Sequence, residues 1–251
     1  MNAEQVRAGI NLHAVLRSLE DLSALDPDAA ALCRGHNLAI RFRVPGIDPL
    51  SLLIGDSDIT AERSTGPGGL KLLFSSPRHF NRFIAGHALP LPAGGLSHLT
   101  FLKNNFAALA NMLERTLRPG AEDLRDAEFR GRNTRLTAAT ALFALSEIAN
   151  LDPLGQQIAR AMGDGALLLE APGDLAFTVE SQGGRLLTKK GAAPDAQAFM
   201  RFDSLDTLGR VLRGETDSYL CVGRGQIAVS GRIPMVDNLN KLLRLTGFYL
   251  K

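Results

Sequence analysis

The sequence lacks the features that mark several common classes of binding protein. Its formal net charge is only +2, so it has little of the clustered positive charge with which a dedicated nucleic-acid binder displaces counterions. Its two cysteines, Cys33 and Cys221, lie in no metal-ligand or CxxC spacing, which favours reduced thiols packed as small apolar groups in the cytoplasm. No apolar run approaches the ~18 residues of a membrane-spanning helix. We therefore expect a cytoplasmic protein with no nucleic-acid partner and no integral membrane contact.

The composition is otherwise that of an ordinary globular protein, with 45% hydrophobic and 22% charged residues. A chain of 251 residues is long enough for two domains. The first 22 residues carry charges every few positions, which predicts an amphipathic helix instead of a targeting segment. The last three residues, 249–251, are not a peroxisomal signal.

The two halves of the sequence resemble each other. In both, a helical pattern runs into Leu-Asp-Pro, at 25–27 and at 151–153. Asp can then cap a second helix whose first position is proline, where the missing N–H costs nothing. The order helix, several strands, helix, strand, helix recurs in each half, and we interpret it as a tandem duplication.

Matched segments carry this correspondence. Strands ending in Pro-Gly are predicted at 38–46 and 166–173, and each is followed later by a strand, a serine cap and a short helix, at 70–86 and 197–214. Each half is then predicted to end in a strand and an apolar helix, at 96–117 and 225–245. We predict domains at 1–117 and 136–251, joined by a charged, solvated linker at 118–135.

Gly55-Asp56-Ser57 follows an apolar run and resembles the serine setting of one hydrolase class. A serine nucleophile needs a base and an orienting acid. All five histidines lie in the first half, and none has aspartate three residues before it. We therefore predict that Ser57 belongs to a hairpin turn, and that the chain is not an enzyme.

Other chemical motifs are equally weak. His79, His87 and His98 have no counterparts in the second half, so a metal site is not predicted. Gly223 and Gly225 form a bare Gly-x-Gly that precedes a strand, whereas a dinucleotide fingerprint follows a strand and opens a helix. We predict no metal and no cofactor.

Apolar helices are the strongest remaining signal. The last helix of each half is more apolar than a surface helix requires. Such a helix must cover either its own sheet or a ligand cavity, because pockets are also lined by apolar residues. From the residues alone, core packing and a binding cavity both stay open.

The second half, from about residue 165 to 245, resembles the sterol carrier protein type 2 family. The resemblance rests on the segments "AFMRFDSLDTLGRVLRGETD" and "GRGQIAVSGRIPMVDNLNKLLRL". They are similar to the family's strand, serine cap, leucine-rich helix and glycine stop, and to its Gly-flanked strand that leads into an apolar helix. The first half resembles the family only through the repeat, and has Leu102-Lys103 where the second half has its second glycine, Gly231.

This resemblance implies a fold and a function. The fold is α/β of the α+β type: two similar domains, each a mostly antiparallel twisted sheet of about five strands covered by helices. The function is non-enzymatic binding of a fatty acid, acyl-coenzyme A, sterol or hopanoid, or phospholipid in an apolar tunnel between sheet and helices. The expected tunnel lining is Leu205, Leu208, Leu212, Ile227, Val229, Met235, Leu239 and Leu243, and in the first half Phe80, Phe83, Ile84, Phe101, Phe106, Leu109 and Leu113.

Three hypotheses follow. The leading one is a lipid-binding or lipid-carrying protein whose partner is a lipid or other apolar small molecule, with transient contact to a membrane surface. The second is a ligand-free scaffold or accessory protein for lipid or isoprenoid-quinone enzymes, acting through dimerisation or protein contacts. The third is a hydrolase that uses Ser57.

Overall fold

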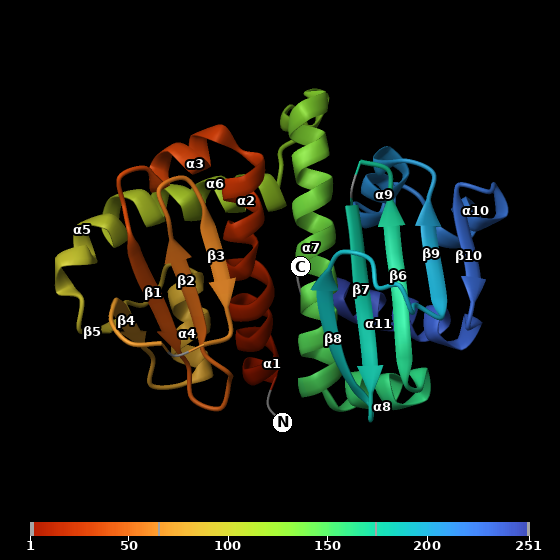
Figure 1. Cartoon of the computed structure of the whole chain (residues 1–251), viewed down its shortest axis with the longest axis horizontal. Coiled ribbons are helices and arrows are strands. Elements are labelled where there is room, and N and C mark those ends of the chain that lie inside the picture. Colours follow the sequence, from red (N-terminus) through yellow and green to blue (C-terminus); the bar gives the residue numbers. More distant parts are fainter. Residues whose placement is uncertain (1–2, 65, 174, 250–251) are drawn as a thin grey trace. The chain divides into compact units, whose positions relative to one another are not determined.

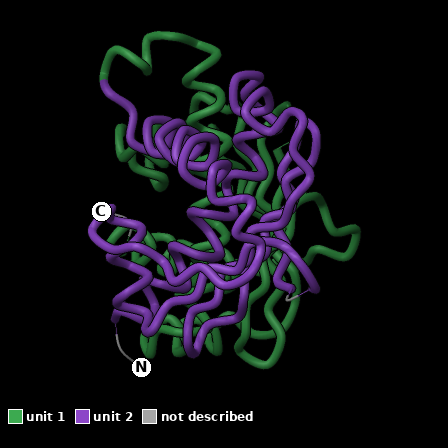
Figure 2. Tube along the Cα trace, turned by 90° about the vertical axis from the view of Figure 1, so that its left-hand side faces the viewer, with its two compact units in different colours: residues 1, 121–251 green, residues 2–120 purple. Residues whose placement is uncertain are grey.

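A computed structural model describes residues 3–64, 66–173 and 175–249 of the chain. The chain divides into two compact units (Figure 2). Of the described residues, those up to residue 120 form the N-terminal unit and those from residue 121 form the C-terminal unit. Each unit contains its own five-stranded sheet and its own covering helices (Figure 1).

The elements of the N-terminal unit are helices α1 (Ala3–Ile10), α2 (Leu19–Leu25) and α3 (Pro27–Cys33), strands β1 (Leu38–Arg43), β2 (Leu50–Ile54), β3 (Ile59–Glu62) and β4 (Leu70–Leu73), helix α4 (Pro77–Ile84), strand β5 (Leu91–Ala93), and helices α5 (Leu99–Phe101) and α6 (Ala107–Leu117). A π-helical turn (Asn11–Val15) and a 3₁₀ turn (Leu16–Ser18) join α1 to α2, so the predicted first helix is present with an interruption. A 3₁₀ turn (Leu96–His98) and a π-helical turn (Leu102–Phe106) flank α5.

The elements of the C-terminal unit are a 3₁₀ turn (Asp123–Arg125), helices α7 (Ala127–Leu151) and α8 (Pro153–Met162), strands β6 (Gly165–Ala171), β7 (Leu175–Gln182), β8 (Arg185–Lys190) and β9 (Ala198–Phe202), helices α9 (Leu205–Leu212) and α10 (Ser218–Gly223), strand β10 (Ile227–Gly231), and helix α11 (Ile233–Tyr249). None of the helices in the described ranges is long and apolar enough to cross a bilayer.

The two sheets have the same topology. Their strand orders are β3-β2-β1-β4-β5 and β8-β7-β6-β9-β10. In each, the first and fourth strands pair in parallel and the other three pairs are antiparallel. The predicted fold class, two similar domains with mostly antiparallel five-stranded sheets covered by helices, is confirmed. Its origin by duplication stays an interpretation.

Side chains alternate along a strand, and one face of each central strand lies wholly in the core. Ile40 and Phe42 of β1 are fully buried, and so are their counterparts Leu167 and Leu169 of β6 to within a few per cent. Residues that pair across strands share a face, so Leu169 and Met200 lie in one row with Val229 of β10. These rows form the floor on which the helices pack.

The predicted helix caps are present in both units. Asp26 accepts hydrogen bonds from the backbone N–H groups of Asp28 and Ala29, and Asp152 accepts one from Gly155. Ser76 and Ser204 likewise cap α4 and α9. These side chains satisfy N–H groups that have no partner within the first turn of a helix.

The predicted strand at the start of 96–117 is wrong. That segment is helical throughout its first residues, and the edge strand is the short β5, which contains Pro92. Proline is tolerated there because the outward-facing N–H of an edge strand needs no partner in the sheet.

The prediction that Leu102-Lys103 occupy the position of Gly231 in the first half is also wrong. A Cβ at Gly231 would lie 2.1 Å from the carbonyl oxygen of Gln197, and a Cβ at Gly95 would lie 2.5 Å from that of Gly69. Gly69 and Gln197 precede the paired residues Leu70 and Ala198, so they are equivalent. The pairings Leu72–Pro92 and Met200–Val229 make Pro92 the counterpart of Val229, so Gly94, and not the Leu102-Lys103 position, corresponds to Gly231, and Gly95 follows it directly. Gly94 and Gly231 both have positive φ, 71° and 80°.

The charged segment 118–135 is only partly irregular. Asp126 caps α7 by accepting from the N–H of Phe129, and the helix then includes the last nine residues of the segment, 127–135. The sequence did not predict helix α10, whose cap is Asp217.

Candidate functional site

The candidate ligand site of the C-terminal unit is the apolar layer between its sheet and helices α9 and α11. Leu205, Leu208 and Leu212 are spaced three and four residues apart and so share one face of α9. Met235 and Leu239 share a face of α11 in the same way, and Leu243 continues it. Helix α11 packs against β9, β10, α7 and α8, while α9 packs against β9 and α7.

Both stripes pass from buried to partly exposed side chains. Leu208 is 2% exposed, whereas Leu205 and Leu212 on either side of it are partly exposed. Met235 and Leu239 are fully buried, whereas Leu243 is partly exposed. On β10, Ile227 is buried and Val229 is partly exposed. The predicted lining therefore connects the interior of this unit with its surface.

The buried part of this layer is closed. Met235 and Leu239 have exposed fractions of 0%, so neither side chain borders a space large enough for a water molecule. Burial of each such side chain contributes about 2 kcal/mol to stability. A ligand that occupied this layer would have to separate the helices from the sheet.

Helix α10 lies beside the exposed end of this layer. It packs against β10, and its Cys221 is buried while Tyr219, Leu220 and Val222 are exposed. The guanidinium of Arg244, on α11, lies 5.5 Å from the centre of the Tyr219 ring. This cation–π contact joins α10 to α11 across the surface of the unit.

The corresponding layer of the N-terminal unit is closed by aromatic rings. Phe74 and Phe80 meet edge to face with their centroids 4.9 Å apart, and Phe83 lies 5.3 Å from Phe74. Phe106 lies 6.1 Å from Phe42 of β1. Of the seven residues predicted to line this unit, Phe83 and Ile84 are partly exposed, while Phe80, Phe101, Phe106, Leu109 and Leu113 are buried.

Ser57 lies in the β2–β3 hairpin, as predicted. The N–H of Gly55 donates to the carbonyl of Asp58 at 2.9 Å, which closes the turn, and Ser57 is exposed. Asp56, the middle residue of the motif, accepts a hydrogen bond from the backbone N–H of Gly35. Within the described chain no imidazole is hydrogen-bonded to the Ser57 hydroxyl.

The histidines do not converge. His79 bonds to the backbone carbonyl of Leu89 and to Ser75, His87 is exposed, and His98 lies at the start of the final helical segment. No cluster of three or more His, Cys, Asp or Glu side chains that could hold a metal occurs in the part of the chain that the structure describes. Cys33 and Cys221 are both free and buried, as predicted.

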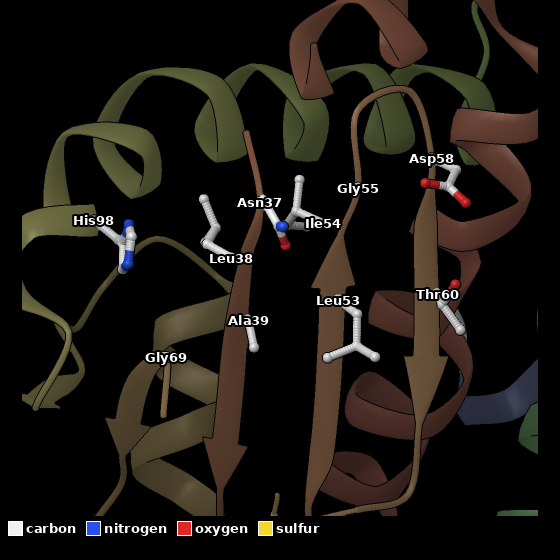
Figure 3. A pocket seen from close by; sticks show the side chains of 10 residues that line it. All are labelled: Asn37, Leu38, Ala39, Leu53, Ile54, Gly55, Asp58, Thr60, Gly69 and His98. Atoms are coloured by element: carbon white, nitrogen blue, oxygen red, sulfur yellow. The ribbon is translucent and has the colours of Figure 1, made fainter. Parts of the chain in front are cut away.

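A separate hollow of about 410 Å³ lies on the sheet of the N-terminal unit. Figure 3 shows Ala39, Leu53 and Thr60 projecting from adjacent strands, with His98 at one side. Its full lining is Asn37, Leu38, Ala39, Leu53, Ile54, Gly55, Asp58, Thr60, Gly69 and His98. The mixture of amide, carboxylate, hydroxyl and imidazole groups differs from the apolar lining that was predicted, and none of the predicted lining residues is in it.

A buried arginine distinguishes the two sheets. Arg41 donates to the carbonyls of Pro67 and Gly68 and to the hydroxyl of Ser51, at 2.8–2.9 Å. The equivalent position in the other sheet is Leu168, because Arg41 pairs with Lys71 as Leu168 pairs with Phe199. Arg41 thus secures the connection between β3 and β4.

Comparisons with known proteins give a structural likeness only. No family model matches the chain, and no curated protein matches it. Among solved structures it is similar to the ubiquinone synthesis protein UbiJ-SCP2, at 18% identity and a TM-score of 0.36, over 45% of this chain and 93% of that one. It is also similar to sterol carrier protein domain 2 of Helicoverpa armigera, at 12% identity and a TM-score of 0.36, over 44% and 87%.

A different kind of protein gives a weaker likeness. The sec-alkylsulfatase Pisa1 from Pseudomonas sp. is similar at 11% identity and a TM-score of 0.29, over 60% of this chain and 29% of that one. At these values none of the likenesses assigns an activity, ligand or partner to this chain. Sterol carrier protein 2 domains, which the sequence motifs resemble, are thus among the solved structures to which the chain is similar.

Proposed function

We propose that the chain binds and carries an apolar small molecule, of the fatty acid, acyl-coenzyme A, sterol or phospholipid class, in its C-terminal unit. The observation that carries this proposal is the pair of stripes on α9 and α11, which pass from exposed to buried apolar residues. The ligand would lie between these helices and the row of β6, β9 and β10 side chains that includes Leu169, Met200 and Val229.

The energetics support a non-covalent carrier. Each methylene group that leaves water contributes about 0.8 kcal/mol, so an acyl chain can bind without a charged anchor. Since the layer is closed, part of this free energy must offset the separation of α9 and α11 from the sheet. Moderate affinity and slow binding are therefore expected, which suits a protein that must also release its cargo.

The side-chain types favour the C-terminal unit as the carrier. Its stripes consist of leucine and methionine, which are flexible and adapt their shape to a ligand. The N-terminal unit instead holds Phe74, Phe80 and Phe83 in edge-to-face and tilted contacts that fix their orientation. One ligand per chain is the expected stoichiometry.

Native mass spectrometry of the freshly purified full chain, followed by organic extraction, tests the proposal. We expect a mass adduct of lipid size at one per chain, released on denaturation. A fluorescent fatty acid added to delipidated protein should bind with the same stoichiometry. A clean mass together with no binding of the fluorescent fatty acid would refute the proposal.

Substitutions that fill the layer locate the site. Leu208→Trp and, at the partly exposed end, Leu243→Trp should lower affinity for the fluorescent fatty acid at least tenfold, since the indole occupies the space of the ligand. Leu109→Trp, at a fully buried position on α6, is the matched control and should leave binding unchanged. The chain has no native tryptophan, so indole emission also reports whether each variant is folded around the new residue.

The closed layer favours a second candidate, a ligand-free scaffold. Met235, Leu239 and Leu208 are buried as fully as ordinary core residues. A scaffold would bind no fatty acid, and its mass in sedimentation would rise with concentration. Under this alternative, Leu208→Trp would lower stability without any effect on ligand binding.

A further inference from the structure

The most exposed leucine among the described residues lies beside the edge strand of the N-terminal unit. Leu89 has 82% of its surface exposed, and Leu91, Leu96 and Leu99 follow within ten residues. We call these four residues the edge leucines. They lie in and around β5, which pairs only with β4 at the end of the sheet order (Figure 1). Several exposed large apolar side chains on one short stretch of chain indicate an interaction surface.

The stretch that carries the edge leucines has an unusual charge pattern. Residues 83–102 contain no Asp, Glu, Lys or Arg at all. From residue 63 to residue 113 there is no acidic residue, whereas five basic residues occur, Arg63, Lys71, Arg78, Arg82 and Lys103. This stretch comprises β4, α4, β5, α5 and the beginning of α6.

The sheet register places the exposed Arg43, on the central strand β1, in the same row as an edge leucine, whereas the neighbouring Arg41 is buried and bonded within the unit. Arg43 pairs with Leu73, which pairs with the edge leucine Leu91, so the three lie in one row. Arg41, Lys71 and Ala93 form the next row in the same way.

The acidic groups of this unit lie elsewhere. Glu62 is on β3, which the strand order places at the opposite edge of the sheet. The carboxylate of Glu4, on α1, accepts a hydrogen bond from the side chain of Asn81 on α4 at 2.7 Å, so it is engaged where these two helices meet. The β5 edge therefore combines exposed leucines with neighbouring sequence that carries basic residues and no acidic ones.

We propose that the β5 edge of the N-terminal unit docks on the surface of an anionic lipid bilayer. The edge leucines would enter the interfacial region, where apolar burial is favourable, and Arg43, Lys71, Arg78 and Lys103 would meet the negatively charged headgroups. Negative charge at the same edge would oppose such docking, and the acid-free stretch removes it. We choose a lipid surface as the partner because an anionic bilayer can receive the exposed leucines and also attract the basic side chains around them.

The equivalent edge of the C-terminal unit provides a contrast. There α10 exposes Tyr219, Leu220 and Val222 beside β10, but Glu215 and Asp217 immediately precede them. Because acidic residues lie next to the apolar ones at this edge, we do not expect it to bind an anionic bilayer. The docking proposal concerns a different unit from the proposed cargo site and does not depend on it.

Vesicle flotation of the full chain tests the docking surface. The vesicles are pure phosphatidylcholine, or phosphatidylcholine with about one third phosphatidylglycerol, at low and high salt (about 50 and 300 mM). We expect at least about tenfold stronger binding to the anionic vesicles at low salt, and a marked loss at high salt. Leu89→Asp/Leu96→Asp should abolish binding, while melting at the temperature of the unsubstituted chain, because both side chains are mostly exposed.

Two further variants test separately whether the position of the leucines and the charge of the basic residues matter for binding. Leu154→Asp/Leu220→Asp introduces the same charge at leucines that are 53% and 48% exposed in the C-terminal unit, and should bind as the unsubstituted chain does. Arg78→Gln/Lys103→Gln should weaken binding to anionic vesicles and reduce its dependence on salt.

The remaining outcomes would overturn the proposal. Equal loss in the Leu154→Asp/Leu220→Asp control would place membrane contact elsewhere. Equal binding to neutral and anionic vesicles would remove the role of charge. Absence of vesicle binding, with a dimer that Leu89→Asp/Leu96→Asp dissociates, would make the β5 edge an interface between copies of this chain.

Discussion

His13 lies in the π-helical turn of the first helix and is 1% exposed. Its Nε2–H donates to the carbonyl of Asp48 at 2.9 Å, and its Nδ1 has no hydrogen-bond partner among the described residues. Burial, assisted by Arg63 and Arg17, lowers the pKa of His13 from 6.5 to about 3. The imidazole is therefore neutral in the folded protein at every pH near neutrality.

This burial makes stability depend on pH. Below pH 6.5 the unfolded chain binds a proton at His13 that the folded protein does not accept until about pH 3, so the free energy of unfolding falls as the pH falls through this window. Between pH 7 and pH 5 the loss from this group should be about 2 kcal/mol. Denaturant titrations of the native chain and of His13→Gln, which cannot titrate, measure it; parallel pH profiles for the two would contradict the prediction.

Arg41 allows a comparison of the same position in two sheets. Arg41→Leu copies the Leu168 side chain of the C-terminal unit, but it leaves the carbonyls of Pro67 and Gly68 and the hydroxyl of Ser51 without their donor. We expect it to lower the free energy of unfolding by about 2–3 kcal/mol. Arg43→Leu, at an exposed position two residues along the same strand, should change it by less than about 0.5 kcal/mol. Urea titration of both variants distinguishes them, and equal effects would show that the Arg41 contacts contribute nothing.

At the scale of elements, the capping aspartates are the features most directly predictable from sequence. Leu-Asp-Pro fixed the starts of α3 and α8, because a side-chain acceptor followed by proline suits only a helix N-terminus. The edge strand β5 was missed because Pro92 argues against a strand wherever the strand's position in the sheet is unknown. Helix α10 has only six residues, too few for a periodic pattern to show.

The two caps should differ in strength. Asp26→Ala should cost about 1 kcal/mol, the usual value for a lost N-cap. Asp152→Ala should cost more, since its second carboxylate oxygen also accepts the hydroxyl of Tyr249 at 2.8 Å and so ties the end of α11 to α8. Tyr249→Phe removes that additional bond alone, and it should account for the difference between the two aspartate variants in thermal unfolding. Equal costs for Asp26→Ala and Asp152→Ala would contradict this.

At the scale of the whole chain, the sequence showed that the helices carrying the predicted lining are apolar. It did not show whether these helices enclose a cavity or pack directly on their sheet. The stripes of Leu208 and Met235 have the same spacing whether they pack on their own sheet or surround a ligand. Their complete burial depends on how the helices settle on the sheet, which no local pattern encodes. The likeness of the two sheets, in contrast, was readable from the repeated order of segments.

Each unit contains one buried thiol, so the local opening of each unit can be measured separately through the reactivity of its cysteine. Cys33 and Cys221 are both free, and burial raises the pKa of the Cys33 thiol, with Asp58 adding to the effect. In Cys33→Ser, a saturating fatty acid should slow the reaction of Cys221 with a thiol reagent by about tenfold at ten times the dissociation constant. In Cys221→Ser, the reaction of Cys33 should be unaffected. Equal slowing of both thiols would mean that cargo binding is not confined to the C-terminal unit.

The parallel pairing of β6 with β9 also sets an order of assembly. Strands β6, β7 and β8 are joined by short connections and can pair as they collapse, whereas Leu167 must wait for Ala198, 31 residues later in the chain, after β7 and β8 are in place. Strand β10 can join the sheet only after β9 has arrived, and α9 and α11 can complete their packing on β9 only then. The segment that folds last is expected to detach first in native fluctuations, so the same chain connectivity that delays folding would provide the opening through which cargo enters and leaves.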